Sequence, residues 1–322
     1  MGWGSSVAKL TVVKPAEPTA IARLIDDYLA HCRASGHSMK TIKDAYGRPL
    51  RNILLPFLAE QKITDPGRLN SRVMDRLSVK LHDEGGPRGP LSPHSIHAYM
   101  RAINSFLSWA HAEGELGEVR AETPRLPKKL VDVLSREEIQ AMEDAAQTER
   151  DKVIVRLLAD TGLRVGELVG LKVSDIIERP GTRGSYYLKV TGKGARDRLV
   201  PIPGLYRRLR RLADKGRPSG ANTDRLFVSR RRRPGGDYEP LDTSGVQQMV
   251  RLLAAEAGIE KRVYPHLLRH SYATWALTKG INPIMLADVL GHNSLTMIQQ
   301  VYAHLAPQDA YAAMAKALRD DE

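Results

Sequence analysis

Apolar residues recur at helical spacing through most of the first third of the chain. In the stretch TAIARLIDDYLAHC they fall three or four residues apart, which places them on one face of a helix. These residues are Ile21, Leu24, Ile25, Tyr28 and Leu29. The segments 38–61, 72–85 and 92–116 are also helical in pattern, and Gly or Pro separates them. Ser92 and Pro93 suit the N-cap and first position of the last helix. We therefore expect a small helical bundle over 19–118.

A second region begins after a proline-containing basic stretch. Ser135 and Glu138 form a capping box that predicts a helix start. A further helix should end at Gly162, because glycine readily adopts the left-handed conformation beyond a helix end.

The stretch SYYLKVTGKGARDRLVPIP gives the clearest β signal, because polar and apolar residues alternate before a Gly-Lys-Gly turn and the apolar Leu199, Val200 and Ile202 follow it. After basic helical turns, we expect SRRRRPGGDYEP to be an exposed loop. Helices are predicted over about 243–257, 265–279, 283–290, 294–303 and 308–319.

Together these patterns predict a mainly α protein with a small antiparallel β-sheet, an α+β class. We expect an N-terminal tail over 1–18, a helical domain over 19–118, a linker over 119–134 and a second domain over 135–322. The length of 322 residues and the 42% hydrophobic content suit two ordinary cores. No apolar run is long enough for a membrane span, and we see no secretory signal.

The formal net charge of +12 favours a polyanionic partner, with nucleic acid first. Three basic groups are candidate phosphate contacts, although each could equally be a solvated surface. They are Lys40, Lys43, Arg48 and Arg51; Lys128 and Lys129; and Arg230, Arg231 and Arg232. The single cysteine, Cys32, excludes a disulfide framework within the chain and suits a reducing cytoplasm.

Four separated motifs contain candidate chemistry. In TGLRVGEL, Arg164 and Glu167 are three apart and could meet on a helix face, as a cleft group or as a surface ion pair. In GKGARDR, Lys193 lies at a hairpin tip, where it could reach a phosphate or simply be solvated. In LGHNSLTMIQQVYAHL, His292 follows a helix end. Tyr302 there is a nucleophile or a half-buried core residue.

The motif HLLRH has the histidine spacing of a zinc-binding helix. However, Leu267 stands where the catalytic glutamate would be, and Arg269 would bring a cation close to the metal. His266 and Arg269 share a helix face, and an arginine can bind two phosphate oxygens at once. The motif therefore favours a phosphate site over a zinc hydrolase.

Taken together, TGLRVGEL, the hairpin lysine, HLLRH, LGH and the following tyrosine resemble the tyrosine recombinases, or phage integrase family. The resemblance covers about 130–310 in order and spacing, and the first half is similar to that family's core-binding, SAM-like domain. It implies a core-binding domain, the linker and a catalytic domain. The chain starts almost directly with the core-binding helices, which favours the simple two-domain, Xer-like or small-integrase type.

The resemblance also implies a role for each site residue. Arg164 and Arg269 hold the scissile phosphate, and Glu167 supports the arginines. Lys193 protonates the leaving 5′ oxygen, His266 accepts the proton of the tyrosine, and His292 donates to a non-bridging oxygen. Tyr302 is the nucleophile that forms a 3′-phosphotyrosyl bond. No metal, ATP or other cofactor is expected.

The implied partner is double-stranded DNA with a specific recombination site, bound by a homotetramer that exchanges its C-terminal helices. An accessory or directionality factor and a cytoplasmic, nucleoid-associated location fit the same picture. Two alternatives stay open: a non-catalytic DNA-binding protein on a recombinase scaffold, and a type IB topoisomerase-like activity. The sequence leaves the target site and the biological role undetermined.

Overall fold

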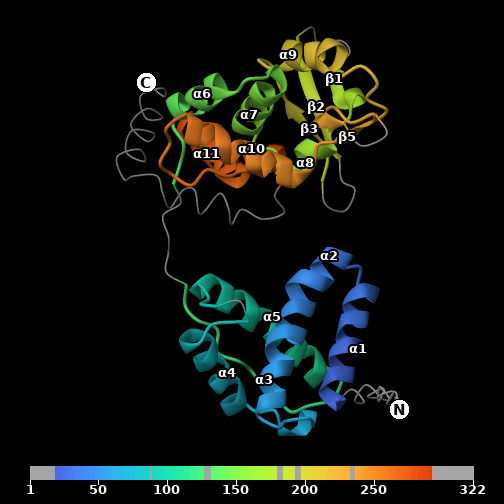
Figure 1. The fold of residues 1–322 in the computed structure, drawn as a ribbon, viewed down its shortest axis with the longest axis vertical. Coiled ribbons are helices and arrows are strands. Elements are labelled where there is room, and N and C mark those ends of the chain that lie inside the picture. The colour runs from blue at the N-terminus through green and yellow to red at the C-terminus, as the bar shows by residue number, and fades with distance from the viewer. Residues whose placement is uncertain are drawn as a thin grey trace, which may run out of the picture. The chain divides into compact units, whose positions relative to one another are not determined.

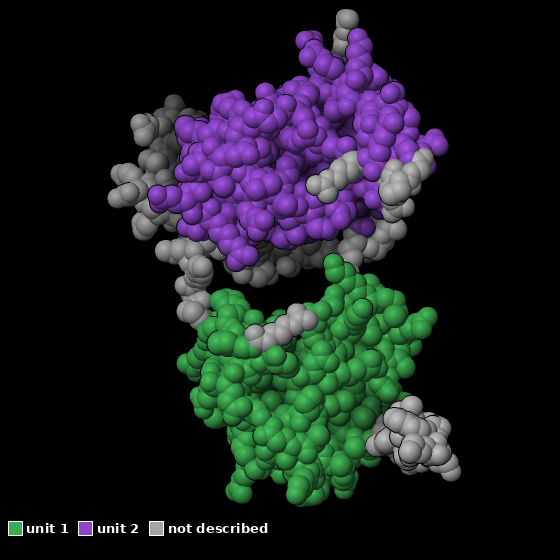
Figure 2. Space-filling model, viewed as in Figure 1, with its two compact units in different colours: residues 1–128 green, residues 129–322 purple. Residues whose placement is uncertain are grey.

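The chain forms two compact units, residues 1–128 and 129–322 (Figure 2). The computed structural model describes residues 19–87, 89–126, 132–179, 184–192, 197–232 and 236–291, apart from the Arg231 side chain. The predicted tail 1–18 and the predicted helices over 294–303 and 308–319 lie outside these residues. Within the described ranges, no helix is long and apolar enough to cross a membrane.

The regular structure in the described part of unit 1 is helical, apart from one isolated bridge between Gly86 and Gly89 (Figure 1). Its α-helices are α1 (Ala20–Ala34), α2 (Met39–Thr41), α3 (Leu55–Glu60), α4 (Ser71–Asp83) and α5 (Pro93–Ala112). Between α2 and α3 the chain continues as the π-helical turns η1 (Ile42–Gly47) and η2 (Leu50–Leu54), and η3 (Pro66–Arg68) is a short 3₁₀ turn. The Ser92 side chain accepts the Ser95 N–H, which confirms the predicted start of α5.

The core of unit 1 forms where the apolar faces of α1, α4 and α5 meet. Tyr28 of α1 contacts the rings of Phe106 and Trp109 from α5, with centroids 5.7 and 5.4 Å apart. Its hydroxyl donates to Ser105, so the one polar atom of this buried ring is satisfied. Cys32 is also buried in this core, which agrees with its position on the inner face of α1.

Unit 2 is built around one almost fully buried helix. Its helices are α6 (Arg136–Ala145), α7 (Glu149–Thr161), α8 (Val165–Gly170), α9 (Tyr206–Arg211), α10 (Thr243–Glu256), α11 (Pro265–Thr278) and α12 (Pro283–Leu290), with short turns η4 (Val173–Asp175) and η5 (Leu212–Gly216). The helix α7 packs against α6, α11 and η5 (Figure 1). The predicted capping box of α6 is present, with Ser135 accepting the Glu138 N–H and Glu138 accepting the Ser135 N–H.

The predicted hairpin belongs to a three-stranded antiparallel sheet, β1 (Ile176–Glu178), β2 (Tyr186–Thr191) and β3 (Asp197–Pro201). Leu188 pairs with Val200, and both are buried together with Val190, whereas Lys189 and Thr191 are exposed. The alternation along β2 therefore marks its inner face correctly, whereas β3 departs from the pattern because Leu199 is exposed. The short strand β1 was not predicted, because the three residues IIE are too few to show alternation.

The prediction of a loop over SRRRRPGGDYEP was wrong at both ends of this stretch, where the chain forms strands. Val228–Arg232 forms β4, which pairs with β5 (Tyr238–Pro240) in an irregular antiparallel register. Strand pairing uses backbone groups, and the Arg232 guanidinium lies 5.1 Å from the centre of the Tyr238 ring, so the arginine covers the hairpin surface. A run of arginines gives no alternation, and for that reason the strand was missed.

In each unit, hydrogen bonds fix one residue of the segment that connects the two units. In unit 1, Asn104 exchanges two 2.8 Å hydrogen bonds with the backbone of Ala121, whose side chain is buried. In unit 2, the Leu134 N–H donates to Ser271 of α11, and Leu134 is buried in the core. The ordered cores of the two units therefore reach to Ala121 on one side and back to Leu134 on the other.

The end of α7 depends on glycine. Gly162 is buried and adopts the left-handed conformation, with φ 61°. A Cβ at this position would lie 2.6 Å from Leu290 and 2.7 Å from Tyr272. Both the backbone conformation and the lack of space therefore exclude a side chain here.

We predict that Gly162→Ala lowers the free energy of unfolding of unit 2 by about 1–3 kcal/mol, from left-handed strain and overpacking. The matched control is Gly166→Ala within α8, where an added Cβ meets nothing within 4 Å. That control should be neutral or slightly stabilising. Denaturant titration of both variants tests the prediction, and equal midpoints for the two would contradict it.

Candidate functional site

A tight turn carries the chain from α7 into the site. After Gly162, the buried Leu163 anchors the turn, and Arg164 takes the N-cap position of α8 with extended backbone. This position aims the arginine away from the helix axis, as expected for a residue at such a junction. Its side chain remains 36% exposed, so the guanidinium is partly open to a ligand.

Glu167 is the negative centre of the site. One carboxylate oxygen accepts Arg164 Nη1 at 2.8 Å, and the other accepts the Arg164 backbone N–H at 2.9 Å. Arg198 of β3 donates to both oxygens, at 3.0 and 2.8 Å. Burial alone would raise the pKa of the Glu167 carboxyl, but the hydrogen bonds and charges of Arg198 and Arg164 outweigh it and lower that pKa. Glu167 is therefore ionised and shared by two arginines.

Arg269 lies behind these residues, inside the protein. It is 2% exposed and donates through Nη1 to the carbonyl of Gly162 and through Nη2 to that of Leu290, the latter at 2.7 Å. Burial, followed by the nearby charge of Arg164, lowers its pKa to about 9. The guanidinium still carries its charge at neutral pH, so a full positive charge lies at the base of the site.

Three arginines meet at the C-terminal end of α12. Arg198 Nε donates to the carbonyl of Val289 at 2.7 Å, and Arg164 Nη2 donates to that of Gly291 at 3.0 Å. The Leu290 carbonyl accepts from Arg269 at 2.7 Å and from Arg164 at 3.4 Å. The last carbonyls of a helix lack partners within the helix and carry partial negative charge. They therefore help to hold cations that would otherwise repel one another.

His266 lies at the start of α11, where Pro265 takes the first helical position. Its side chain keeps contact with solvent, but the surrounding protein and then the charges of Arg269 and Arg164 lower its pKa from the ordinary 6.5. The imidazole is therefore neutral at pH 7 and can accept a proton.

The structure brings Arg164, Glu167, His266 and Arg269 together. Lys193, His292 and Tyr302 lie outside the described residues, as do Lys128 and Lys129. The flanks of two of them are described. Strand β2 ends at Thr191 before Lys193 and β3 begins at Asp197 after it, and Gly291, which caps α12, directly precedes His292. In the described part of the chain, no three His, Cys, Asp or Glu side chains are placed to hold a metal ion.

The sequence reasoning missed Arg198. Val200 is buried, so strand alternation places residue 198 on the inner face of β3, while Leu199 between them is 46% exposed. A charged residue inside and a leucine outside reverse the usual pattern. That reversal is the signal that could have identified Arg198 as a site residue.

The basic candidates in unit 1 differ in their surroundings. Arg48 pairs with Asp44 at 3.2 Å and Arg51 with Asp26 at 2.7 Å, both on the surface. Within the described ranges, Lys40 and Lys43 make no ion pair, so their charges are available to a ligand.

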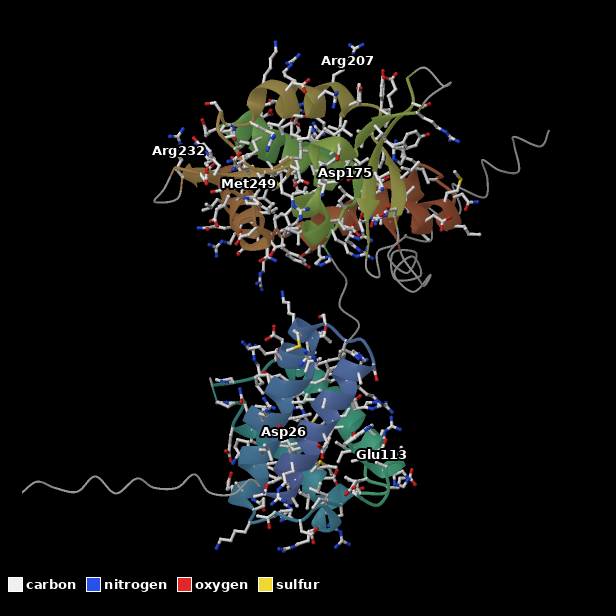
Figure 3. The ribbon with its side chains drawn as sticks, turned by 90° about the vertical axis from the view of Figure 1, so that its right-hand side faces the viewer. Asp26, Glu113, Asp175, Arg207, Arg232 and Met249 are labelled. Atoms are coloured by element: carbon white, nitrogen blue, oxygen red, sulfur yellow. The ribbon has the colours of Figure 1, made fainter. Side chains whose placement is uncertain are left out.

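The arginine hairpin of unit 2 is exposed. The Arg230 side chain is 63% exposed and lies 3.9 Å from Asp151, and Arg232 is exposed at the edge of the unit (Figure 3), with its guanidinium over the Tyr238 ring. Arg231 belongs to β4, but its side chain is not described.

Comparison with known proteins identifies the family of the chain. The model of the phage integrase family matches residues 132–309. A tyrosine recombinase of Thermosipho africanus is 30% identical, over 92% of this chain and 99% of its own. The tyrosine recombinase XerA of Thermococcus onnurineus is also 30% identical, over 92% and 96%. The crystal structure of the XerH site-specific recombinase bound to its difH substrate has a similar fold, with a TM-score of 0.64 at 20% identity over 90% of this chain and 83% of that one. The chain therefore belongs to the phage integrase family, the tyrosine recombinases.

Proposed function

We propose that Arg164 and Arg269 bind the scissile phosphate of a specific DNA site and that Tyr302 attacks it. The chain is then a site-specific recombinase that cleaves and rejoins DNA. The observation that supports this most directly is the convergence of two guanidinium groups on the helix end that precedes His292, with the His266 imidazole close enough for their charges to lower its pKa. Such a cluster suits a phosphodiester, which becomes more negative as a nucleophile adds to it.

In the proposed first step, the Tyr302 phenolate oxygen bonds to phosphorus and the bond to the 5′ oxygen breaks. His266, which is neutral at pH 7, accepts the phenol proton, and Lys193 protonates the leaving 5′ oxygen. His292 donates to a non-bridging oxygen. The product is a 3′-phosphotyrosyl bond and a free 5′ hydroxyl.

The second step reverses the first. A 5′ hydroxyl from a partner strand attacks the phosphotyrosyl bond, and the proton donor and acceptor exchange roles. Because the covalent intermediate conserves the energy of the phosphodiester, the proposed reaction needs no ATP. The fixed cations supply the charge stabilisation that a metal ion provides in other phosphoryl-transfer sites.

The two arginines contribute differently. Arg164 is 36% exposed and donates to Glu167 and to backbone carbonyls, so it can turn part of its guanidinium toward a phosphate. Arg269 is buried and acts at closer to full strength, because little water screens its charge. We expect Arg164 to set the orientation of the phosphate and Arg269 to supply the field beneath it.

We further propose that double-stranded DNA is held mainly through phosphate contacts, as its charge density requires. The candidate contacts are Lys40, Lys43, Arg48, Arg51, Lys128, Lys129 and the arginines of β4.

The active assembly is proposed to be a homotetramer with exchanged C-terminal helices, acting in the cytoplasm on the chromosome, with or without an accessory factor. The mass of the complex on a two-site duplex, measured by light scattering, tests the tetramer.

Tyr302→Phe should abolish covalent capture of DNA while leaving DNA binding within about twofold, because only the nucleophilic oxygen is lost. The protein is mixed in EDTA with nicked duplexes of random sequence, and DNA that stays attached after denaturation is sequenced and its peptide mapped. Adducts at Tyr302 in the unaltered protein support the proposal and reveal the target site. Adducts formed by Tyr302→Phe would refute the role of Tyr302.

Two other results of this experiment would redirect the assignment. Bound DNA without adducts would favour a non-catalytic DNA-binding protein. Adducts followed by relaxation of supercoiled DNA without strand exchange would favour a type IB topoisomerase-like activity. Recombinant products from two copies of the recovered site support the recombinase.

The cleavage rate should depend on His266 in a way that its surroundings dictate. Since its pKa is lowered below 6.5, the neutral form dominates at pH 7, and the rate should fall only as the pH drops through that lowered pKa. Removing one of the charges responsible, in Arg164→Gln, should move the His266 pKa upward. NMR titration of the imidazole measures both, with Arg208→Gln as a control remote from His266. A His266 pKa at or above 6.5 in the unaltered protein would contradict the prediction.

The pair of unpaired lysines in unit 1 gives a test of the DNA surface. If Lys40 and Lys43 each contact a phosphate, the double alanine variant should reduce the slope of log affinity against log salt by about 2. The control is Lys80→Ala, since Lys80 is already paired with Glu60 and Glu84. An unchanged slope in the double variant would remove these lysines from the interface.

A further inference from the structure

Arg198 joins three segments that surround the site. It lies on β3, binds both oxygens of Glu167 from α8 at 3.0 and 2.8 Å, and donates to the Val289 carbonyl of α12 at 2.7 Å. Its side chain is 14% exposed, and every one of its nitrogen atoms has a partner in the described chain. Because three of its five N–H donors are engaged inside the protein and little of its side chain is exposed, Arg198 is poorly placed to bind substrate itself.

Arg198 donates one N–H to each carboxylate oxygen of Glu167, and this forked contact determines how Glu167 binds Arg164. Both carboxylate oxygens receive one N–H from Arg198, and each receives one further N–H from Arg164, one from the side chain and one from the backbone. Arg164 is therefore held by a single side-chain bond to Glu167, and its other guanidinium nitrogen turns to the carbonyl of Gly291. Without Arg198, Arg164 could take the carboxylate with both nitrogens, as arginines prefer.

Such a change in pairing would alter how far the charge of Arg164 is compensated. In the present arrangement one carboxylate serves two guanidinium groups, so part of the charge of Arg164 stays uncompensated. If Glu167 paired with Arg164 alone, a full negative charge would lie beside the group that meets the phosphate. The attraction of Arg164 for the phosphate would then weaken, and its guanidinium would be drawn toward α8.

The Arg198 guanidinium also packs closely against the backbone of Gly291. A Cβ at Gly291 would lie 2.9 Å from Nη1, 3.0 Å from Cζ and 3.1 Å from Nε of Arg198. Gly291 has φ 65°, so glycine is required there both for the left-handed turn and for the guanidinium lying against it. Arg198 thus contacts the residue that immediately precedes His292.

Building on the proposed function, we propose that Arg198 is a positioning residue: it occupies Glu167 so that Arg164 stays oriented toward the scissile phosphate. It also binds the Val289 carbonyl near the end of α12, which His292 follows in the chain, and it lies one residue into β3, on the side of the strand toward Lys193 in the sequence. One side chain then sets the relative positions of three segments that supply charge to the phosphate.

The test is the single-turnover rate of adduct formation on a nicked duplex containing the recovered target site. Arg198→Lys keeps a positive charge but cannot form the fork, and Arg198→Gln removes the charge. Both should slow cleavage about 10- to 100-fold, the loss expected for a misplaced catalytic group, with DNA affinity within about twofold. A cleavage rate equal to that of the unaltered protein in both variants would overturn the proposal.

A second substrate separates positioning from stability. Replacing a non-bridging oxygen of the scissile phosphate by methyl removes the charge that Arg164 neutralises, so the defect of Arg164→Gln should shrink on this substrate. If Arg198 acts through Arg164, the defect of Arg198→Gln should shrink in parallel, and the double variant should be little worse than Arg164→Gln alone. Defects of equal size on both substrates, additive in the double variant, would overturn it.

The matched control is Arg208→Gln, which removes an arginine of unit 2 that bridges Glu143 and Glu149 far from the site chemistry. Thermal unfolding of all variants is measured, and Arg208→Gln should lose stability without losing cleavage rate. If Arg198→Gln does not fold, Arg198→Lys gives the same comparison. Failure of the unaltered protein to form any adduct refutes the proposed function, whereas normal adduct formation by the Arg198 variants refutes only this inference.

Discussion

The catalytic unit has to hold three guanidinium groups close together in a half-buried place. Like charges at this range repel strongly where water is excluded, so the arrangement is stable only with a compensating negative field. The ionised Glu167 and the terminal carbonyls of α12 provide that field. Three features meet this one electrostatic requirement. They are the buried Glu167 carboxylate, the glycine turns that end α7 and α12, and the strand β3 that carries Arg198.

The same requirement explains why backbone geometry is so prominent in the site. Gly162 ends α7 and offers its carbonyl to Arg269, and Gly291 ends α12 and offers its carbonyl to Arg164. Carbonyls at helix ends have no partner within the helix, so their use by arginines satisfies both groups at once. A phosphate that enters the site meets cations already held in place, which lowers the cost of reorganisation during the reaction.

Much of this architecture could be predicted from the sequence, because local rules act there without competition. The Ser135 capping box, the glycine end of α7 and the inner face of β2 each follow from a few neighbouring residues, and the structure confirms them. The site residues Arg164 and Arg269 could be named because their motifs resemble a known family in order and spacing. The end of α12, where they meet, is predicted from the sequence, but the binding of its carbonyls to arginines is not, since any residue supplies a carbonyl.

Two features that the sequence did not predict, Arg198 and the strand β4, also have physical explanations. Arg198 escaped attention because its role depends on a carboxylate on another element. The strand β4 escaped because arginine stems cover a sheet surface without the alternation of apolar residues.

The anchors at Ala121 and Leu134 limit how far the two units can separate. The chain between them takes thirteen steps, so even fully extended it spans at most about 45 Å. In the proposed DNA complex, the unit that binds first keeps the other within this reach of the duplex, which raises the effective concentration of the second unit. Two surfaces that each bind weakly can then give tight binding together, and a single weak contact in either unit affects the affinity of the whole chain.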